Sequence, residues 1–274
     1  MRKAKLVCIA VICAVLFAPL FAYAGGPGPV KISTMSRVES HTKVADVNGN
    51  YGGETYIYNM ISATRVLKSN VLGNIFYLNQ YSTDNKKIIA HIGGATVIKV
   101  FSPKLIGTLG YIFSSNPKLG SPDFLNTYLP LQNQDRFSGS ILYNINPKSK
   151  GVKYTLISGY GLQYNLLPGL SGFNPAGRNK ERTISERIGA AFPIFNKNWT
   201  GELGYTYTYD LDKDINNVRL GQLTNQYAAN LTYKLNKENR LEFGYLFINK
   251  LFGTDSSPVP NDSAFRVTLL HSFN

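Results

Sequence analysis

Strict alternation of apolar and polar side chains is the feature that most constrains this fold. From residue 199 to 210 one phase reads Trp, Gly, Leu, Tyr, Tyr, Tyr, and the other reads Thr, Glu, Gly, Thr, Thr, Asp. Successive side chains of a β-strand point to opposite faces, so this pattern predicts a strand with one apolar and one polar face. It does not fit the period of a helix, which is near 3.6 residues.

The same alternation recurs along the chain and predicts a series of strands. It is clear over 137–145, 154–164, 227–235 and 241–247, and weakest in the first three expected strands. The expected strands are 31–46, 54–67, 70–82, 87–101, 104–115, 135–146, 151–165, 184–195, 198–210, 223–235, 239–250 and 263–273. Short links alternate with long ones, as in a barrel with one short-turn rim and one long-loop rim. We therefore expect an all-β fold, a single transmembrane antiparallel up-and-down β-barrel of about 12 strands.

The first 24 residues have the form of a cleavable signal peptide. Three basic residues precede an apolar run over 6–21, and Ala22-Tyr23-Ala24 has the small-x-small form of a cleavage site. We expect Sec-type export, cleavage after Ala24, and a barrel over residues 25–274. An uncleaved anchor is the alternative, which Pro19 and the cleavage motif argue against. Later apolar stretches are all shorter than the roughly 18 residues of a helical span.

Charge and cysteine content narrow the partners. Both cysteines, Cys8 and Cys13, lie in the expected signal, so the remaining chain has neither a disulfide nor a thiolate metal site. Removing the three basic signal residues from the 29 of the chain leaves 26 against 16 acidic ones, a net charge near +10. This excess suggests anionic partners, namely outer-membrane lipid, lipopolysaccharide or small anionic solutes, and export disfavours nucleic acid.

The last expected strand has a distinctive pattern: Phe265, Val267, Leu269, His271 and Phe273 alternate with Arg266, Thr268, Leu270 and Ser272. This end of the chain resembles Gram-negative outer-membrane β-barrel proteins of the porin-like superfamily. Strands of this kind are recognised by the barrel-assembly machinery and usually end on an aromatic residue, whereas here Phe273 is followed by Asn274. The resemblance implies a location in the cell outer membrane.

Aromatic residues fall near the ends of the expected strands. On a barrel these are positions where a ring sits at the lipid head-group level. The expected interface aromatics are Tyr143, Tyr154, Phe195, Trp199 and Phe273 near one rim and Tyr164, Tyr209, Phe247 and Phe265 near the other. A sugar-stacking surface is the alternative interpretation.

The phase opposite the apolar one gathers basic residues. The expected pore-lining set is Arg37, Lys43, Arg65, Lys99, Lys153, Arg187, Lys234, Arg240 and Arg266. The acids on the same phase are Glu39, Glu202 and Glu242, and nine against three predicts a basic lumen. The alternative is that these charges pair with one another in a filled interior.

No motif for catalysis or metal binding stands out in the sequence. Ser40 and His41 are adjacent, as are His271 and Ser272, and neighbours on a strand face opposite ways, so neither pair can form a nucleophile and its base. The aspartates of 210–214 lack the glycine and distal glutamate of a calcium loop. We therefore expect no metal and no cofactor, and we favour a protein that is not an enzyme.

These patterns together predict a passive channel for small hydrophilic, preferentially anionic solutes. Two other classes remain open at this point. One is an outer-membrane enzyme that modifies lipid or lipopolysaccharide, and the other is a structural or adhesive barrel with partner-binding loops.

Overall fold

A computed structural model describes residues 29–45, 51–84, 86–115, 134–165, 180–213, 219–250 and 261–273. The strands are β1 (Lys31–Ala45), β2 (Tyr51–Lys68), β3 (Val71–Ser82), β4 (Lys87–Val100), β5 (Leu105–Ser115), β6 (Gln134–Asn144), β7 (Lys153–Asn165), β8 (Lys180–Ile194), β9 (Trp199–Lys213), β10 (Arg219–Lys234), β11 (Asn239–Lys250) and β12 (Asp262–Phe273). The expected signal peptide, residues 1–24, lies outside the described residues, and its cleavage stays a prediction.

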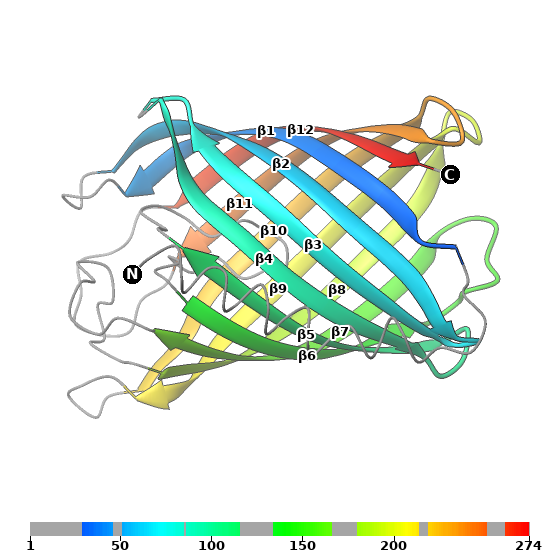
Figure 1. Ribbon diagram of the computed structural model, residues 1–274, viewed down its shortest axis with the longest axis horizontal. Coiled ribbons are helices and arrows are strands. Elements are labelled where there is room, and N and C mark those ends of the chain that lie inside the picture. The colour runs from blue at the N-terminus through cyan, green and yellow to red at the C-terminus, as the bar shows by residue number, and fades with distance from the viewer. Residues whose placement is uncertain are drawn as a thin grey trace.

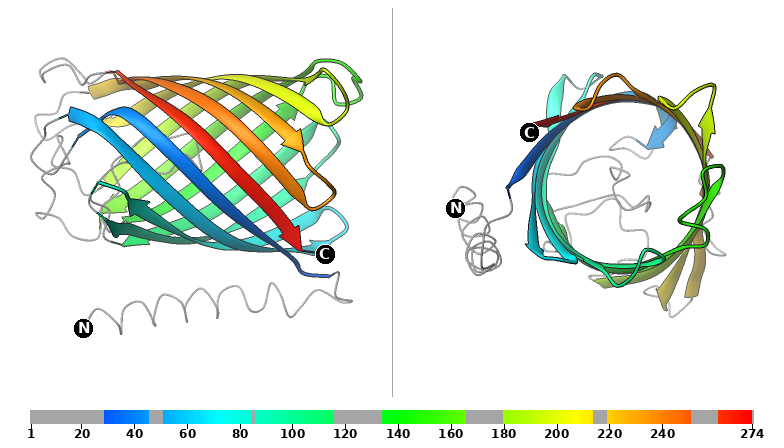
Figure 2. Two further views of the ribbon diagram at one scale, coloured as in Figure 1. Left: turned by 90° about the horizontal axis from the view of Figure 1, so that it is seen from above. Right: turned by 90° about the vertical axis from the view of Figure 1, so that its right-hand side faces the viewer.

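The twelve strands form one closed antiparallel barrel in which each strand pairs with its sequence neighbours. β12 completes the ring by pairing with β1, and the two lie side by side in Figures 1 and 2. Viewed along its axis, the barrel is a ring of tilted strands (Figure 2). The expected fold class is confirmed, with all twelve expected strands present. No helix in the described part of the chain is long and apolar enough to cross a membrane.

Some strands run further toward the long links than the alternation indicated. β8 begins at Lys180, four residues before the expected start, and pairs with β7 as far as Tyr164. β10 begins at Arg219, which pairs with Lys213 of β9. Backbone pairing needs no apolar side chains, so the ladder continues where the side-chain pattern has already stopped.

Asparagine side chains organise three of the short turns. Asn146 Oδ1 accepts a hydrogen bond from the backbone N–H of Tyr154 at 2.8 Å, and Asn196 Oδ1 accepts one from Asn198 at 2.9 Å. Asn236 Oδ1 accepts from the N–H groups of Glu238 and Asn239. The bonds of Asn196 and Asn236 to residues two positions on imitate a backbone turn, whereas the bond of Asn146 ties the two ends of its link together.

The two phases of each strand define an outer and an inner face, because direct cross-strand partners lie on the same face. Large apolar side chains stand exposed on the outer face, for example Leu109 at 70% and Phe265 at 67%. The inner face carries most of the buried polar and charged side chains. It also holds an apolar cluster on β1 to β4 that includes Met35, Tyr58 and Leu78.

Candidate functional site: the charged inner face

The inner face of the barrel is the candidate site, because it brings charged side chains from distant parts of the chain together. The strand register places six of the nine expected basic residues on this face. They are Arg37, Lys153, Arg187, Lys234, Arg240 and Arg266.

Two of the expected pore-lining residues are on the wrong face. Arg65 pairs with Gly73, and Lys99 pairs with Val71 and Gly107, all in the outer phase of their strands. Lys99 Nζ reaches the short turn and donates to Asn70 Oδ1 at 2.8 Å. The assignment failed because β2 and β4 carry apolar side chains on both phases, so hydrophobicity alone does not select the outer one.

Lys43 lies in an irregularity of the ladder. The register between β1 and β2 shifts between His41 and Val44, so simple alternation does not fix the direction of the Lys43 side chain. The side chain is exposed, and the Lys43 backbone N–H donates to Asp262 Oδ1 at 2.9 Å.

The sequence prediction did not include several charged residues that the register places on the inner face, among them Arg136, Glu54 and Asp262. Arg136 of β6 pairs with Ile112 and Gln163 on the inner face. Glu54 is the direct partner of His41, and Asp262 is the partner of Ile248. The alternation of Phe137 with Ser138 could have identified Arg136. Glu54 and Asp262 lie at strand ends, where the alternation is already lost. They make the excess of basic over acidic inner-face residues smaller than the nine against three expected from the sequence.

Four inner-face arginines lie two by two on opposite sides of the ring of strands. Arg37 and Arg266 come from the adjacent strands β1 and β12, whereas Arg136 and Arg187 come from β6 and β8. In the closed order of the twelve strands, β6 and β7 lie halfway round from β12 and β1. The lumen therefore has arginine on two facing walls.

Three of these arginines lie against a glycine of a neighbouring strand. A Cβ added at Gly161 would be 2.9 Å from Arg136 Nη2, and one added at Gly204 would be 3.2 Å from Arg187 Nη2. At Gly244 the added atom would be 2.6 Å from Arg266 Cγ. These glycines leave room for each arginine to lie sideways along the wall.

Arg187 has an acidic partner at the accessible part of the wall. Its Nη2 donates to Glu202 Oε1 at 2.8 Å, and the Glu202 side chain is 43% exposed. An ion pair this exposed to water leaves the arginine charge only partly compensated. The pair is therefore compatible with a positive wall.

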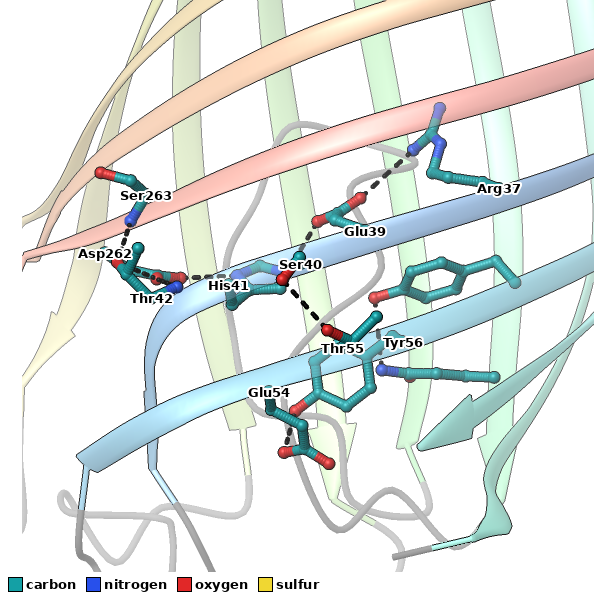
Figure 3. Close-up of polar contacts among 12 residues, drawn as sticks. Arg37, Glu39, Ser40, His41, Thr42, Glu54, Thr55, Tyr56, Asp262 and Ser263 are labelled. Atoms are coloured by element: carbon teal, nitrogen blue, oxygen red, sulfur yellow. Dashed lines mark hydrogen bonds and ion pairs between the residues drawn. The ribbon is translucent and has the colours of Figure 1, made fainter. Parts of the chain in front are cut away.

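Arg37 and Arg266, on the opposite wall, belong to a buried charge network at the junction of β1 and β12, which we call the seam, and Arg266 is the direct cross-strand partner of Glu39. Figure 3 shows the part of the seam around His41. His41 Nδ1 lies 2.6 Å from Asp262 Oδ2, and His41 Nε2 lies 2.8 Å from Glu39 Oε1. Both ring nitrogens thus meet carboxylate oxygens. An imidazolium satisfies this arrangement, because only the charged ring donates from both nitrogens.

The seam network extends in both directions from His41 (Figure 3). Arg37 Nη1 lies 3.8 Å from Glu39 Oε2, and Arg37 Nε donates to Thr268 Oγ1 of β12 at 3.0 Å. At the other end, Asp262 Oδ1 accepts from the backbone N–H groups of Thr42 and Lys43. The first and last strands of the barrel are therefore joined by side chains as well as by backbone.

A second acid beside the seam is held by hydroxyl groups. Tyr56 Oη donates to Glu54 Oε2 at 2.6 Å, and Ser82 Oγ donates to the other oxygen, Oε1. Tyr56 also packs edge-on against His41, with ring centroids 5.6 Å apart. Polar side-chain contacts therefore connect β1, β2, β3 and β12 near the long-link ends of these strands.

Solvent access divides the inner wall into two levels. Near the short turns Thr200, Lys234 and Arg240 are exposed. Nearer the long links Gln80 and Thr208 are buried, at 0% and 1% exposure. Water therefore reaches the described inner wall mainly from the short-turn side.

Neither of the two serine–histidine neighbours considered from the sequence forms a nucleophile and its base. Ser40 is on the outer face and bonds to Thr55 Oγ1 at 3.0 Å, away from His41. His271 Nδ1 bonds to Asn239 Oδ1 at 2.8 Å. Among the described residues, no group of three or more His, Cys, Asp or Glu side chains is arranged to hold a metal ion.

The expected interface aromatics that the structure describes lie on the outer phase or in a turn. Tyr143, Tyr154 and Phe273 are exposed near the short-turn rim, and Phe195 lies in the β8–β9 turn at 87% exposure. The remaining outer-phase rings are those of Trp199, Tyr209, Phe247 and Phe265. Tyr164 is on the outer phase by register, but its side chain is outside the described residues.

Comparison with known proteins places the chain by fold. No protein-family model matches the sequence, and no curated protein matches it. The solved structures it resembles include an outer-membrane channel from Pseudomonas putida F1, with 9% identity, a TM-score of 0.58, and coverage of 92% of this chain and 98% of that one. The NanC porin aligns with 7% identity and a TM-score of 0.52, over 86% of this chain and 98% of that one.

A third similar structure is the KdgM porin solved in complex with disordered oligogalacturonate, with 12% identity and a TM-score of 0.50, over 88% of this chain and 99% of that one. At such identities the likeness concerns the fold. The chain has the fold of porin-like outer-membrane β-barrels.

Proposed function

We propose that the protein is an outer-membrane channel for small hydrophilic solutes with a preference for anions. The observation that carries this proposal is the placement of arginine on two facing inner walls, Arg37 and Arg266 on one and Arg136 and Arg187 on the other. Fixed cations within a low-dielectric wall raise the local concentration of anions and repel cations. The channels and porins of the same fold support the general class.

The wall at β6 to β8 is the better candidate for contact with a solute. Arg187 pairs with the half-exposed acid Glu202, whereas Arg37 lies beside Glu39, which is buried in the seam. The neighbouring inner side chains of this wall are small, such as Ser138, Ser140 and Ser185. A passing anion would therefore meet the Arg187 guanidinium and these hydroxyls.

The membrane context completes the proposal. The exposed aliphatic outer face suits lipid, and the aromatic residues near the rims suit the lipid head-group level. We propose that the chain is exported by its N-terminal signal, inserted with the help of the barrel-assembly machinery through β12, and surrounded by outer-membrane lipid and lipopolysaccharide.

The test is a bilayer recording on refolded protein that begins at Gly25. In a salt gradient, the zero-current potential of the parent protein should have the sign expected when anions are more permeant than cations. Arg136→Gln with Arg187→Gln should lower the anion-to-cation permeability ratio several-fold. The control is Lys150→Gln with Lys237→Gln, which removes the same charge from exposed short turns.

Three results decide the proposal. A shift in the wall variant that the turn control does not share supports it. A cation-selective parent contradicts the anion preference. A parent that inserts but never conducts contradicts the channel itself.

A further inference from the structure

We infer that the head-group layer of one leaflet meets the barrel along a row of tyrosine–polar pairs on the outer wall. The long-link ends of the strands then stand beyond the hydrocarbon. The inference rests on the membrane placement proposed above. It is independent of whether the lumen conducts.

The same outer-face pair occurs at three places around the barrel. Tyr77 Oη lies 2.6 Å from His91 Nδ1 across β3 and β4. Tyr205 Oη donates to Asn225 Oδ1 at 2.7 Å across β9 and β10, and Tyr245 Oη donates to Ser263 Oγ at 3.1 Å across β11 and β12. We call these the tyrosine pairs.

The three tyrosine pairs share one geometry. The direct cross-strand partners of the tyrosines are Gly93, Tyr227 and Phe265. In each case the polar residue lies two positions from that direct partner, toward the long links. Every tyrosine thus keeps its ring on the short-turn side and points its hydroxyl toward the long-link side, as an amphipathic ring does at a membrane boundary.

On the short-turn side of the tyrosine pairs the outer wall is apolar. Ile188, Leu203 and Val267 are exposed at 49%, 53% and 44%. A shallow apolar hollow of about 440 Å³ lies here, lined by Tyr205, Tyr227 and other residues over a floor that includes alanine and glycine. Exposed aliphatic side chains and an apolar hollow suit acyl chains.

At the level of the tyrosine pairs the wall becomes polar. Glu186 is exposed on the outer face, is the direct partner of Tyr207, and accepts a hydrogen bond from Ser158 Oγ at 2.7 Å. On the other side of the barrel, Ser36 donates to Asn59, and Asn59 donates to Asn79. A carboxylate facing hydrocarbon is costly, so Glu186 indicates a hydrated layer at this level.

Strand length agrees with this boundary. A tilted strand needs roughly 9–11 residues to cross the membrane. β2 has 18 residues and β10 has 16, which is more than a crossing requires. The outer charges Arg65 and Lys99 lie near the short turns, so they fit the opposite boundary and leave the apolar band between the two levels.

The single tryptophan of the chain allows a depth measurement. In a Trp199→Phe background, three variants place one tryptophan along the outer face of β9: Leu203→Trp, Tyr207→Trp and Tyr209→Trp. Each is inserted into phosphatidylcholine vesicles, and its fluorescence is quenched either by lipids brominated on the acyl chains or by iodide in the water. The unmodified Trp199 protein reports whether the barrel has inserted.

The boundary predicts a steep change along this strand. Chain-brominated lipid should quench Leu203→Trp strongly and Tyr209→Trp several-fold less, while iodide should show the reverse order and Tyr207→Trp should fall between. Equal lipid quenching at 203 and 209 would mean that hydrocarbon reaches the strand ends, and it would overturn the inference. Weak lipid quenching at 203 with strong quenching of Trp199 would mean that another protein covers this wall, which also overturns it. No quenching of Trp199 itself would instead contradict the membrane placement.

Discussion

The seam wall at β12 and β1 and the facing wall at β6 to β8 each carry two inward arginines and hold them in different ways. At the seam, Arg37 and Arg266 lie among buried acids, with Glu39 and Asp262 bridged by His41. On the facing wall, Arg136 is buried beside Gly161, and Arg187 pairs with Glu202, whose side chain is 43% exposed.

The difference separates two uses of the same residue type. Opposite charges buried together stabilise a structure only as a complete set, because loss of one partner leaves another charge without compensation in a low dielectric. An arginine such as Arg187, whose acidic partner Glu202 is half exposed to solvent, retains a field that a solute can sense. We therefore expect substitutions at the seam to change stability, and substitutions on the facing wall to change selectivity.

The largest effect is expected at Asp262, whose side chain is fully buried. Asp262→Ala should lower the free energy of unfolding by about 3–5 kcal/mol, because it leaves His41 without one of its two acids. Urea unfolding in lipid vesicles measures the change. Thr183→Ala, at a buried inner position near the long-link end of β8, is the control and should cost far less. A loss at Asp262 no greater than that of the control would show that the seam network contributes little.

The next largest effect concerns the outer face of β9, the strand beside the facing wall. Leu203→Arg places a charge among exposed aliphatic side chains and should cost about 2–4 kcal/mol in the same vesicle assay. Thr200→Arg, on the inner phase of β9 and exposed near a short turn, should be tolerated. An equal loss of stability in both variants would mean that the inner and outer faces of β9 are assigned wrongly.

A smaller effect is expected from the glycine beneath Arg136. In Gly161→Ala the new Cβ would lie 2.9 Å from Arg136 Nη2 and also 2.9 Å from Thr183 Oγ1, so the guanidinium must move. Anion selectivity should change measurably with little loss of stability. Gly159→Ala is the matched control on the same strand and face, since its new Cβ would meet nothing closer than 3.7 Å. Identical recordings from the two variants would contradict a role for the glycine in placing Arg136.

The smallest effect is expected at Lys153, which is exposed at the short-turn rim. Lys153→Gln should shift the zero-current potential slightly at low salt. The shift should disappear near 1 M salt, where the Debye length is about 3 Å. A shift that persists at high salt would indicate that Lys153 lies closer to the solute path than its exposure suggests.

The sequence predicted most of the architecture because its determinants are local. Alternation identified a strand within a few residues, and asparagine-rich short links such as that at Asn236 indicated hairpins. Where alternation was clean, as around Leu203, it also identified the outer face correctly. Where a strand is apolar on both phases, as around Arg65 and Lys99, the sequence did not indicate which phase faces outward.

The charged contacts of the candidate site depended on the tertiary structure. His41 and Asp262 are 221 positions apart in the chain and meet because β12 pairs with β1. Arg136 and Arg187 oppose the seam only because the ring closes with twelve strands. The sequence by itself determined the strands, their order and the two-faced wall, since each follows from neighbouring residues. Which charges are buried together and which face one another was decided by the closure and stagger of the whole barrel, because these depend on every strand pairing at once.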